Sequence, residues 1–184
     1  PLLDPMCGAG TFSLEAAMMA KRIPAGLNRA FAFMGWPVFS KRQWAFLIRQ
    51  AHSKIRRLPR PCIFASDIDP SASSRLAELV DRIGFSDTVR VSQADFLQSR
   101  PPAHGAPPGL MAINPPYGIR LGSGTQADAL LAAICRHLVM HFKGWRLVLV
   151  TPRPELTHRL QQPDEPFTLR HGGITLTAII ETIK

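Results

Sequence analysis

Cysteine is scarce in this chain of 184 residues, and that scarcity excludes whole classes of protein. Cys7, Cys62 and Cys135 are odd in number and far apart in the sequence, so neither a disulfide framework nor a zinc knuckle is indicated. A reduced, cytoplasmic setting fits this usage. Cys7 stands in a glycine turn with no histidine near it in the sequence, so we interpret it as a small turn residue rather than a nucleophile.

A convincing cluster of metal ligands is missing as well. His137 and His141 stand four residues apart on a predicted helix and could hold a metal ion. No carboxylate or third ligand is near them in the sequence. We therefore interpret them as a solvated pair and expect no metal.

Long apolar runs are absent too. No segment approaches the ~18 uninterrupted apolar residues of a membrane span, and no basic start followed by an apolar run marks a secretory signal. The chain begins at Pro1, almost inside its first predicted strand. We therefore expect it to be a piece excised from a longer protein.

Acidic residues are few beside the basic ones. The chain has 13 Asp and Glu against 22 Lys and Arg, which gives a formal net charge of +9. With a pI near 10.5, the chain favours a polyanionic partner such as a nucleic acid. The alternative is that its acidic complement lies in a part of the protein outside this sequence.

Phosphate-binding glycine signatures are incomplete near the start of the chain. Residues 2–12 place Asp4 at an apolar strand end, with Gly8 and Gly10 in the turn before a helical pattern. Glycines let the chain turn sharply and let a ligand approach the backbone. A dinucleotide fingerprint would require a third glycine where Ser13 stands, and no Gly-Lys-Ser/Thr P-loop is present.

A stiff corner is the strongest feature that is present. The apolar run 110–113, predicted as a buried strand, is followed by Asn114-Pro115-Pro116-Tyr117-Gly118. Two prolines remove two backbone donors and hold the residues before them extended. Such a corner could accept hydrogen bonds from an NH2 group and stack a planar ring beside it. The alternative is a proline-stiffened turn with a packed tyrosine.

Taken together, Asp-Pro-Met-Cys-Gly-Ala-Gly-Thr-Phe and Asn-Pro-Pro-Tyr-Gly-Ile-Arg-Leu resemble one family. This is the catalytic domain of the THUMP-associated, UPF0020-type RNA guanine-N2 methyltransferases, a group also described as N6-adenine-specific DNA methylases. Shorter matches extend the resemblance through most of the chain, at 24–29, 31–33, 66–70, 94–96 and 144–145. The two long motifs are specific when they occur together.

The resemblance implies a cofactor and a set of site residues. The cofactor is S-adenosyl-L-methionine, and the catalytic residues are Asn114, Pro115 and Tyr117. The implied cofactor-binding residues are Asp4, Met6, Gly8, Gly10, Thr11, Asp67, Ile68, Asp95, Phe96 and Asn114. Among them, the acidic residue at 95 is expected on the adenine amino group, with Phe96 packing on the ring. The alternative for Asp95 is a cap on the next turn.

A second carboxylate follows from the strand pattern. The strand at 62–65 ends at Ser66-Asp67-Ile68-Asp69. In a doubly wound sheet, an acidic residue at this strand end can bind the ribose hydroxyls of a nucleoside. We favour Asp67 over Asp69 because it is nearer the strand.

The order of elements predicts an α/β fold with an open sheet, in one catalytic domain spanning 1–184. The expected helices are 11–23, 41–58, 70–83, 126–142 and 154–161, and the further expected strands are 88–93, 110–113, 145–150, 167–170 and 174–183, with a loop at 99–109. Gly172-Gly173 signals a terminal hairpin. The resemblance implies the Rossmann-like class I methyltransferase sheet, mostly parallel and seven-stranded, with a C-terminal antiparallel hairpin.

Two features near the first third of the chain suggest a surface role. The irregular segment 27–40 is aromatic, and we interpret it as a hydrophobic lid over the core, with a substrate pocket as the alternative. The helix at 41–58 has an apolar stripe, while basic residues crowd the remainder of its surface. A one-sign face favours contact with phosphates. A plain solvated face is the alternative.

These features together predict methylation of an exocyclic amine, most specifically guanine N2 in ribosomal RNA. Residues 118–121 and 24–33 favour RNA guanine within the resembled family. The family's RNA-binding THUMP module would lie N-terminal to this chain, and no membrane partner is expected. One departure is His171-Gly172 where the family has Asn-Gly. The alternatives are an adenine-N6 DNA methyltransferase, a nucleotide-binding Rossmann oxidoreductase and a non-catalytic RNA-binding module.

Overall fold

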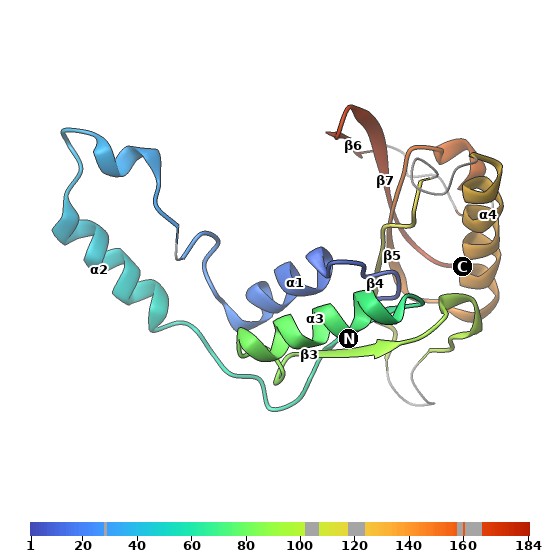
Figure 1. Ribbon diagram of the computed structural model, residues 1–184, viewed down its shortest axis with the longest axis horizontal. Coiled ribbons are helices and arrows are strands. Elements are labelled where there is room, and N and C mark those ends of the chain that lie inside the picture. Colours follow the sequence, from blue (N-terminus) through green and yellow to red (C-terminus); the bar gives the residue numbers. More distant parts are fainter. Residues whose placement is uncertain (28, 102–106, 118–123, 158–159, 161–166) are drawn as a thin grey trace.

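Seven strands form one sheet in the order β3-β2-β1-β4-β5-β7-β6, as the computed structural model of the chain shows (Figure 1). The structure describes residues 1–27, 29–101, 107–117, 124–157, 160 and 167–184. The strands are β1 (Leu2–Asp4), β2 (Ile63–Asp67), β3 (Val89–Gln93), β4 (Leu110–Ile113), β5 (Arg146–Thr151), β6 (Phe167–His171) and β7 (Ile174–Thr182).

Strand direction confirms the predicted fold class. The pairs from β3 through β5 are all parallel, whereas β7 runs antiparallel to both β5 and β6. The turn between β6 and β7 is made by Gly172 and Gly173, whose φ angles are +57° and +81°. Positive φ at both central residues is what the tight hairpin turn requires, so the predicted turn is confirmed.

Helices α1 (Thr11–Lys21), α3 (Pro70–Arg82) and α4 (Gly124–His141) pack against the sheet, whereas α2 (Lys41–His52) lies apart from it. The short 3-10 turns are η1 (Ala32–Gly35), η2 (Phe96–Gln98) and η3 (Pro154–Thr157). One buried cluster joins α1 and α3 to β2 and β3. A second, larger cluster joins α4 to β4, β5 and β7. Within the described residues, no helix is both long and apolar enough to cross a bilayer.

Local chemistry explains where α3 begins. Asp69 precedes α3, and its Oδ1 accepts a hydrogen bond from the backbone N–H of Ser71 at 2.9 Å. Pro70 follows at the first helical position, where its missing N–H costs nothing.

The predicted helix at 154–161 is described only as the four-residue turn η3, because residues 158–159 and 161 lie outside the described part of the chain.

A long excursion separates α1 from β2. Residues 24–60, here called the arm, contain η1 and α2 and project away from the sheet (Figure 1). Neither η1 nor α2 contains a buried residue. The arm returns to the end of α1, where the Arg56 backbone N–H donates to the Lys21 carbonyl at 2.9 Å. α2 ends at His52 and not at residue 58 as predicted, because the N–H groups of Lys54 and Ile55 bond the third residue back in place of the fourth and that of Arg56 bonds to α1.

The aromatic residues of the arm pack on one another. The ring centroid of Phe33 lies 5.3 Å from those of Phe31 and Trp44 and 5.9 Å from that of Phe39. Trp36, at the rim of this group, is 62% exposed. The predicted hydrophobic lid over the core is therefore wrong, because these half-buried rings pack on one another within the arm instead of meeting the sheet.

Candidate active site

The glycine bend and the proline corner lie at the same edge of the sheet. β1 and β4 are adjacent and parallel, so the bend that follows β1 and the corner that follows β4 leave the sheet side by side. β2 pairs with β1 on its other side, and the strand order reverses at β1. Ligands of open α/β sheets bind at such a switch point, beyond the carboxyl ends of the strands.

The two glycines of the bend have different surroundings. Gly10 has φ +81°, and a Cβ built on it would meet Leu76 Cδ1 at 2.3 Å, so α3 packs directly against this backbone. Gly8 has φ +51°, and a Cβ there would have no atom within 4 Å. The backbone is therefore packed on its inner side at Gly10 and open at Gly8. Such an open backbone is where a ligand can approach the chain closely.

Asp67 joins the bend to the end of β2. Its Oδ2 accepts a hydrogen bond from the Gly8 N–H at 2.9 Å, and its Oδ1 accepts one from the Asp69 N–H at 3.0 Å. The carboxylate of Asp69 instead caps α3 through the Ser71 N–H. The structure thus brings Asp67, and not Asp69, against the glycine bend. Ile68 beside it is 65% exposed, and Thr11 lies exposed at the start of α1.

Asp4 lies behind the bend rather than on its open side. It is 1% exposed, and its Oδ2 accepts hydrogen bonds from the Ser13 N–H at 3.1 Å and the Ser13 hydroxyl at 2.7 Å. This pair ties the end of β1 to the first turn of α1. Burial raises the pKa of Asp4 to about 6, although both bonds from Ser13 oppose the rise. Met6 is partly buried and packs against the larger core cluster.

Changing Asp4 to asparagine should remove a pH-dependent cost in stability. The folded pKa of about 6 exceeds the ordinary value of 3.8, so the folded state binds the proton more tightly. Stability therefore falls as pH rises between these values, and the whole cost, about 3 kcal/mol, is present above them. Asparagine is neutral, has nearly the same shape and still accepts the bonds from Ser13.

The measurement for Asp4→Asn is urea unfolding of both proteins across the pH range. We expect the free energy of unfolding of the variant to exceed that of wild type by about 2.5 kcal/mol more at about pH 8 than at about pH 4, where part of the cost is already present. Other titrating groups are the same in both proteins, so their contributions cancel when one free energy of unfolding is subtracted from the other at each pH. A difference that stays constant with pH would contradict a buried carboxyl with a raised pKa.

Asp95 and Phe96, the residues predicted to bind adenine, have different surroundings: Asp95 caps a turn and Phe96 lies in the core. Asp95 Oδ1 accepts from the Leu97 N–H at 2.9 Å, and its Oδ2 accepts from Gln98 Nε2 at 3.1 Å. The capping alternative for Asp95 is therefore observed. Phe96 is 2% exposed, and its ring lies 5.7 Å from that of Phe142. The ring thus fills the core, and contact of either residue with an adenine stays a prediction.

At the corner, an amide and a phenol contact one another. Asn114 is exposed and Pro115 is buried, and the Tyr117 hydroxyl donates a hydrogen bond to Asn114 Oδ1. Tyr117 and Phe12 of α1 both pack against a cluster of Val150, Leu176 and Ala178. Burial raises the pKa of Tyr117, although the bond to Asn114 opposes the rise. The phenol is therefore a donor at neutral pH.

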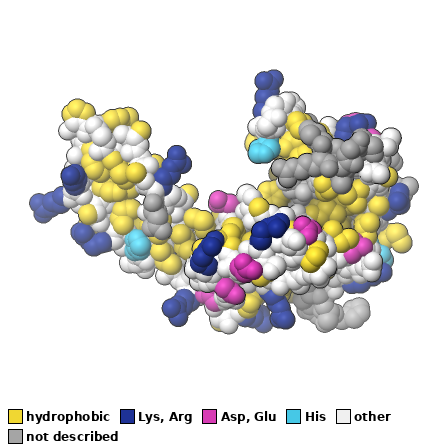
Figure 2. Space-filling view, in the orientation of Figure 1, with side chains coloured by type: hydrophobic (Ala, Val, Ile, Leu, Met, Phe, Trp, Pro, Cys, Tyr) yellow, Lys and Arg dark blue, Asp and Glu magenta, His cyan; other side chains and the backbone are white. Residues whose placement is uncertain are grey.

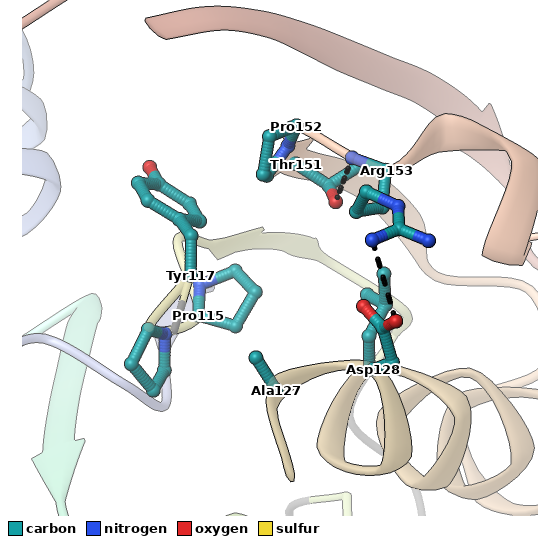
Figure 3. Close-up of a pocket in the computed structure, with 9 residues that line it drawn as sticks. Pro115, Tyr117, Ala127, Asp128, Thr151, Pro152 and Arg153 are labelled. Carbon is teal, nitrogen blue, oxygen red and sulfur yellow. Dashed lines mark hydrogen bonds and ion pairs between the residues drawn. The ribbon is translucent and has the colours of Figure 1, made fainter. Parts of the chain in front are cut away.

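A pocket opens beside the corner, with a volume of about 110 Å³. It is lined by Pro115, Pro116, Tyr117, Ala127, Asp128, Leu131, Thr151, Pro152 and Arg153. Figure 3 shows Tyr117 and Pro115 on one side and the Arg153–Asp128 ion pair on the other. A guanidinium nitrogen lies 3.4 Å from Asp128 Oδ2, and the Arg153 N–H donates to the Thr151 hydroxyl at 3.0 Å.

Sequence reasoning missed the polar residues of this pocket. Thr151 ends β5, which pairs directly with β4, so the rule that ligands bind beyond strand ends would have found it. Asp128 lies on α4 and carries no such signal. The predicted residues Gly118, Ile119, Arg120 and Leu121 lie outside the described residues, as does Asn28 of the segment 24–29.

Cys7 and His137 both lie buried in the structure. Burial raises the pKa of Cys7 to about 12, helped by the charges of Asp4 and Asp67, so its thiol stays protonated and is no nucleophile.

His137 is 7% exposed and bonds the Ser99 carbonyl through Nε2 at 3.1 Å. The prediction of a solvated pair is therefore wrong for His137. Within the described part of the chain, no three candidate metal ligands come together.

Comparison with known proteins places this geometry in a family. The chain is 36% identical over 179 residues to "Ribosomal RNA large subunit methyltransferase K/L" of Chromohalobacter salexigens, covering 95% of this chain and 24% of that protein. It is 37% identical over 176 residues to the protein of that name from Pseudoalteromonas atlantica, covering 95% and 25%. The chain thus spans about a quarter of the length of these curated relatives.

Solved structures share the fold. A "possible methylase" from Clostridium difficile 630 superposes with a TM-score of 0.84 at 26% identity, covering 100% of this chain and 48% of that one. The structure of SMU.472 complexed with SAH superposes with a TM-score of 0.82 at 24% identity, with the same coverage. The family description that matches residues 1–178 is that of the RMKL-like methyltransferase domain. The chain with the glycine bend and the double-proline corner side by side belongs to this family, UPF0020.

Proposed function

We propose that this chain uses S-adenosyl-L-methionine to methylate an exocyclic amine of a nucleic-acid base, namely guanine N2 in ribosomal RNA of the large subunit. The observation that carries the proposal is the juxtaposition of the open backbone at Gly8 with the Asn114–Tyr117 corner, through adjacent parallel strands. The names of the curated relatives support the RNA and the subunit.

The residues at the edge of β1 and β2 fit this cofactor. The open side of Gly8 leaves room for a ligand against the backbone, and the Asp67 carboxylate, a ribose-binding group in this fold class, lies against it. Ile68 exposes an apolar side chain beside them, suited to the face of a purine. Gly10 and Thr11 begin α1, whose N-terminal end favours a carboxylate. Asp4 would act by positioning Ser13 and the bend.

The corner fits the amine. When bound, the cofactor supplies a methyl group on a positively charged sulfonium. The lone pair of a base amine is delocalised into the ring, and acceptors on its two hydrogens would localise that pair on nitrogen. Asn114 Oδ1 and the Pro115 carbonyl are proposed as these acceptors. Because a carbonyl oxygen has two lone pairs, Oδ1 can keep the Tyr117 hydroxyl and accept the amine as well.

The pocket beside the corner suits guanine in particular. A base must leave its stack to reach such a site, and the Tyr117 ring offers it a stacking surface. Arg153 presents donors of the kind that pair with guanine O6 and N7, and Asp128 presents a carboxylate for the N1–H. Adenine has an acceptor at N1, which would face the Asp128 carboxylate with the wrong polarity, and it has no O6 acceptor for Arg153.

The proposal extends to the protein that contains this chain. Relatives about four times longer than the matched segment leave room for further domains, and we propose an N-terminal RNA-binding domain among them, with RNA as the partner. No disulfide joins the cysteines of the described residues, which suits the cytoplasm, where ribosomal RNA is modified.

Methyl transfer from labelled cofactor tests the proposal. The chain is incubated with unmodified large-subunit ribosomal RNA, with transfer RNA and with duplex DNA, and the products are digested and identified as nucleosides. We expect label in N2-methylguanosine from the ribosomal RNA. Label in N6-methyladenine from DNA would replace the proposal with the adenine alternative. Stabilisation of the chain by NAD but not by S-adenosyl-L-methionine in a thermal shift would overturn both.

A further inference from the structure

The net charge of the chain is confined to one continuous segment. Residues 16–66 contain 10 of the 22 Lys and Arg and none of the 13 Asp and Glu. The remaining residues contain 12 basic and 13 acidic side chains and are nearly neutral. The segment therefore accounts for the whole formal charge of +9, and most of it is the arm.

Among the described residues, the cations of the arm have no carboxylates beside them to compensate their charge. Within this part of the chain, the basic partners in the ion pairs are Lys21, which precedes the arm, and Arg153. Figure 2 shows dark-blue Lys and Arg side chains around the arm and no magenta carboxylate on it. An ordinary solvated helix surface mixes both signs. A projection of a single sign that contributes nothing to the core has the charge distribution that attracts a polyanion.

The exposed face of α2 adds an aromatic ring to the charge. Arg42, Phe46 and Arg49 are spaced four and three residues apart, so they share one helical face. Phe46 is 52% exposed, and both arginines are exposed. The opposite stripe contains Trp44, which packs against the rings of Phe31 and Phe33. The internal packing of the arm therefore does not explain Phe46.

We propose that the Arg42–Phe46–Arg49 face is an RNA-docking surface, in which the two guanidinium groups contact phosphates and the phenyl ring stacks on an unpaired base. Cationic grooves with interleaved aromatic rings bind single-stranded nucleic acid in this way. The choice of RNA rests on the proposed function. Charge complementarity favours it over a protein partner, which would require acidic groups to match every cation of the arm.

The arm is also placed to guide RNA toward the corner. Figure 2 shows the molecule hollowed between the arm and the β6–β7 hairpin, and Figure 1 shows α1 along the floor of this hollow. Tyr117 packs in the cluster that contains Phe12 of α1 and Leu176 of β7. An RNA held on the arm and crossing the hollow would thus reach the end at which the base is methylated.

RNA affinity of matched variants tests the docking surface. The probe is a fluorescently labelled RNA hairpin with a single-stranded tail, and its anisotropy is followed at several salt concentrations. Arg42→Glu/Arg49→Glu reverses two positive charges on the arm. Arg75→Glu/Arg82→Glu makes the same change of charge at two exposed positions of α3. We expect the arm variant to bind at least about tenfold more weakly, with a salt slope reduced by roughly 1.5 to 2. The α3 variant should bind within about threefold of wild type.

Phe46→Ala separates stacking from charge. It should weaken binding by on the order of tenfold, since a stacked base contributes about 1–3 kcal/mol, while leaving the salt slope unchanged. Equal losses in the two double variants would overturn the proposal, because only overall charge would then matter. Wild-type affinity in the arm variant would overturn it too, because the arm would then not contact the RNA. Circular dichroism confirms that each variant is folded.

The outcome is separable from that of the proposed function. RNA binding is measured without cofactor and without methyl transfer. If the wild-type chain binds RNA through the arm but transfers no methyl group, the docking surface stands and the proposed activity fails. If the arm variants bind RNA normally while N2-methylguanosine still forms, the activity stands and the docking surface fails.

Discussion

Asn114→Ala should lower methyl transfer by at least about a hundredfold, the loss seen when one preorganised polar group is removed from a transition state. Asn114 is an exposed residue directly after β4, and its side-chain oxygen is proposed to hold a hydrogen of the reacting amine. Alanine removes that acceptor and leaves the glycine bend and Asp67 untouched. Cofactor affinity should therefore fall by much less than the rate of methyl transfer.

Two measurements on the same variant decide this prediction. Single-turnover methyl transfer to ribosomal RNA reports the chemical step, and calorimetric titration with S-adenosyl-L-methionine reports cofactor binding. Tyr117→Phe gives a graded comparison, because it keeps the stacking ring and removes only the hydroxyl that donates to Asn114 Oδ1. Its loss should be smaller than that of Asn114→Ala. Full activity in Asn114→Ala would remove the corner from the chemistry.

Short-range patterns predicted the edge of the sheet correctly because they report strand ends directly. Asp4, Asp67 and Asn114 each follow an apolar run, and parallel strands place their carboxyl ends at one edge. The order of the strands is not encoded locally, since β1 pairs with β2 across more than fifty intervening residues and with β4 across about a hundred. The family resemblance therefore contributed more to the predicted topology than any periodicity.

The errors have a common physical cause, which is that burial depends on distant partners. His137 was predicted to be solvated from its own helix, but Phe96 and Phe142 pack against its ring. The rings at 31–39 have the composition of a core, yet they pack on Trp44 within the arm. An amphipathic stripe shows that a helix has an apolar side. It does not show what that side contacts.

The polar lining of the pocket shows the same limit at the site. Arg153 follows β5, and Asp128 lies on α4, so their ion pair joins elements that the sequence separates. Neither residue belongs to a motif. Their proposed recognition of guanine follows only from seeing them opposite Tyr117 (Figure 3).

Asp67→Ala should weaken cofactor binding by on the order of tenfold or more, because a hydrogen bond to a charged acceptor contributes about 1.5–3 kcal/mol. Asp67 is proposed to bind the ribose hydroxyls, and its Oδ2 also holds the Gly8 N–H. Alanine removes both interactions. The loss should appear in the dissociation constant for S-adenosyl-L-methionine, measured by calorimetry, and in the Michaelis constant.

Asp69→Ala is the matched control for Asp67→Ala, since the two carboxylates are two residues apart and differ in their partners. Asp69 caps α3 through the Ser71 N–H, so its loss should cost about 1 kcal/mol of stability. Cofactor affinity should stay within about threefold of wild type. The reverse pattern, with Asp69→Ala losing cofactor and Asp67→Ala losing only stability, would exchange the two roles. Because Asp67 contacts the bend and Asp69 contacts the helix, the distinction tests the geometry at β2 directly.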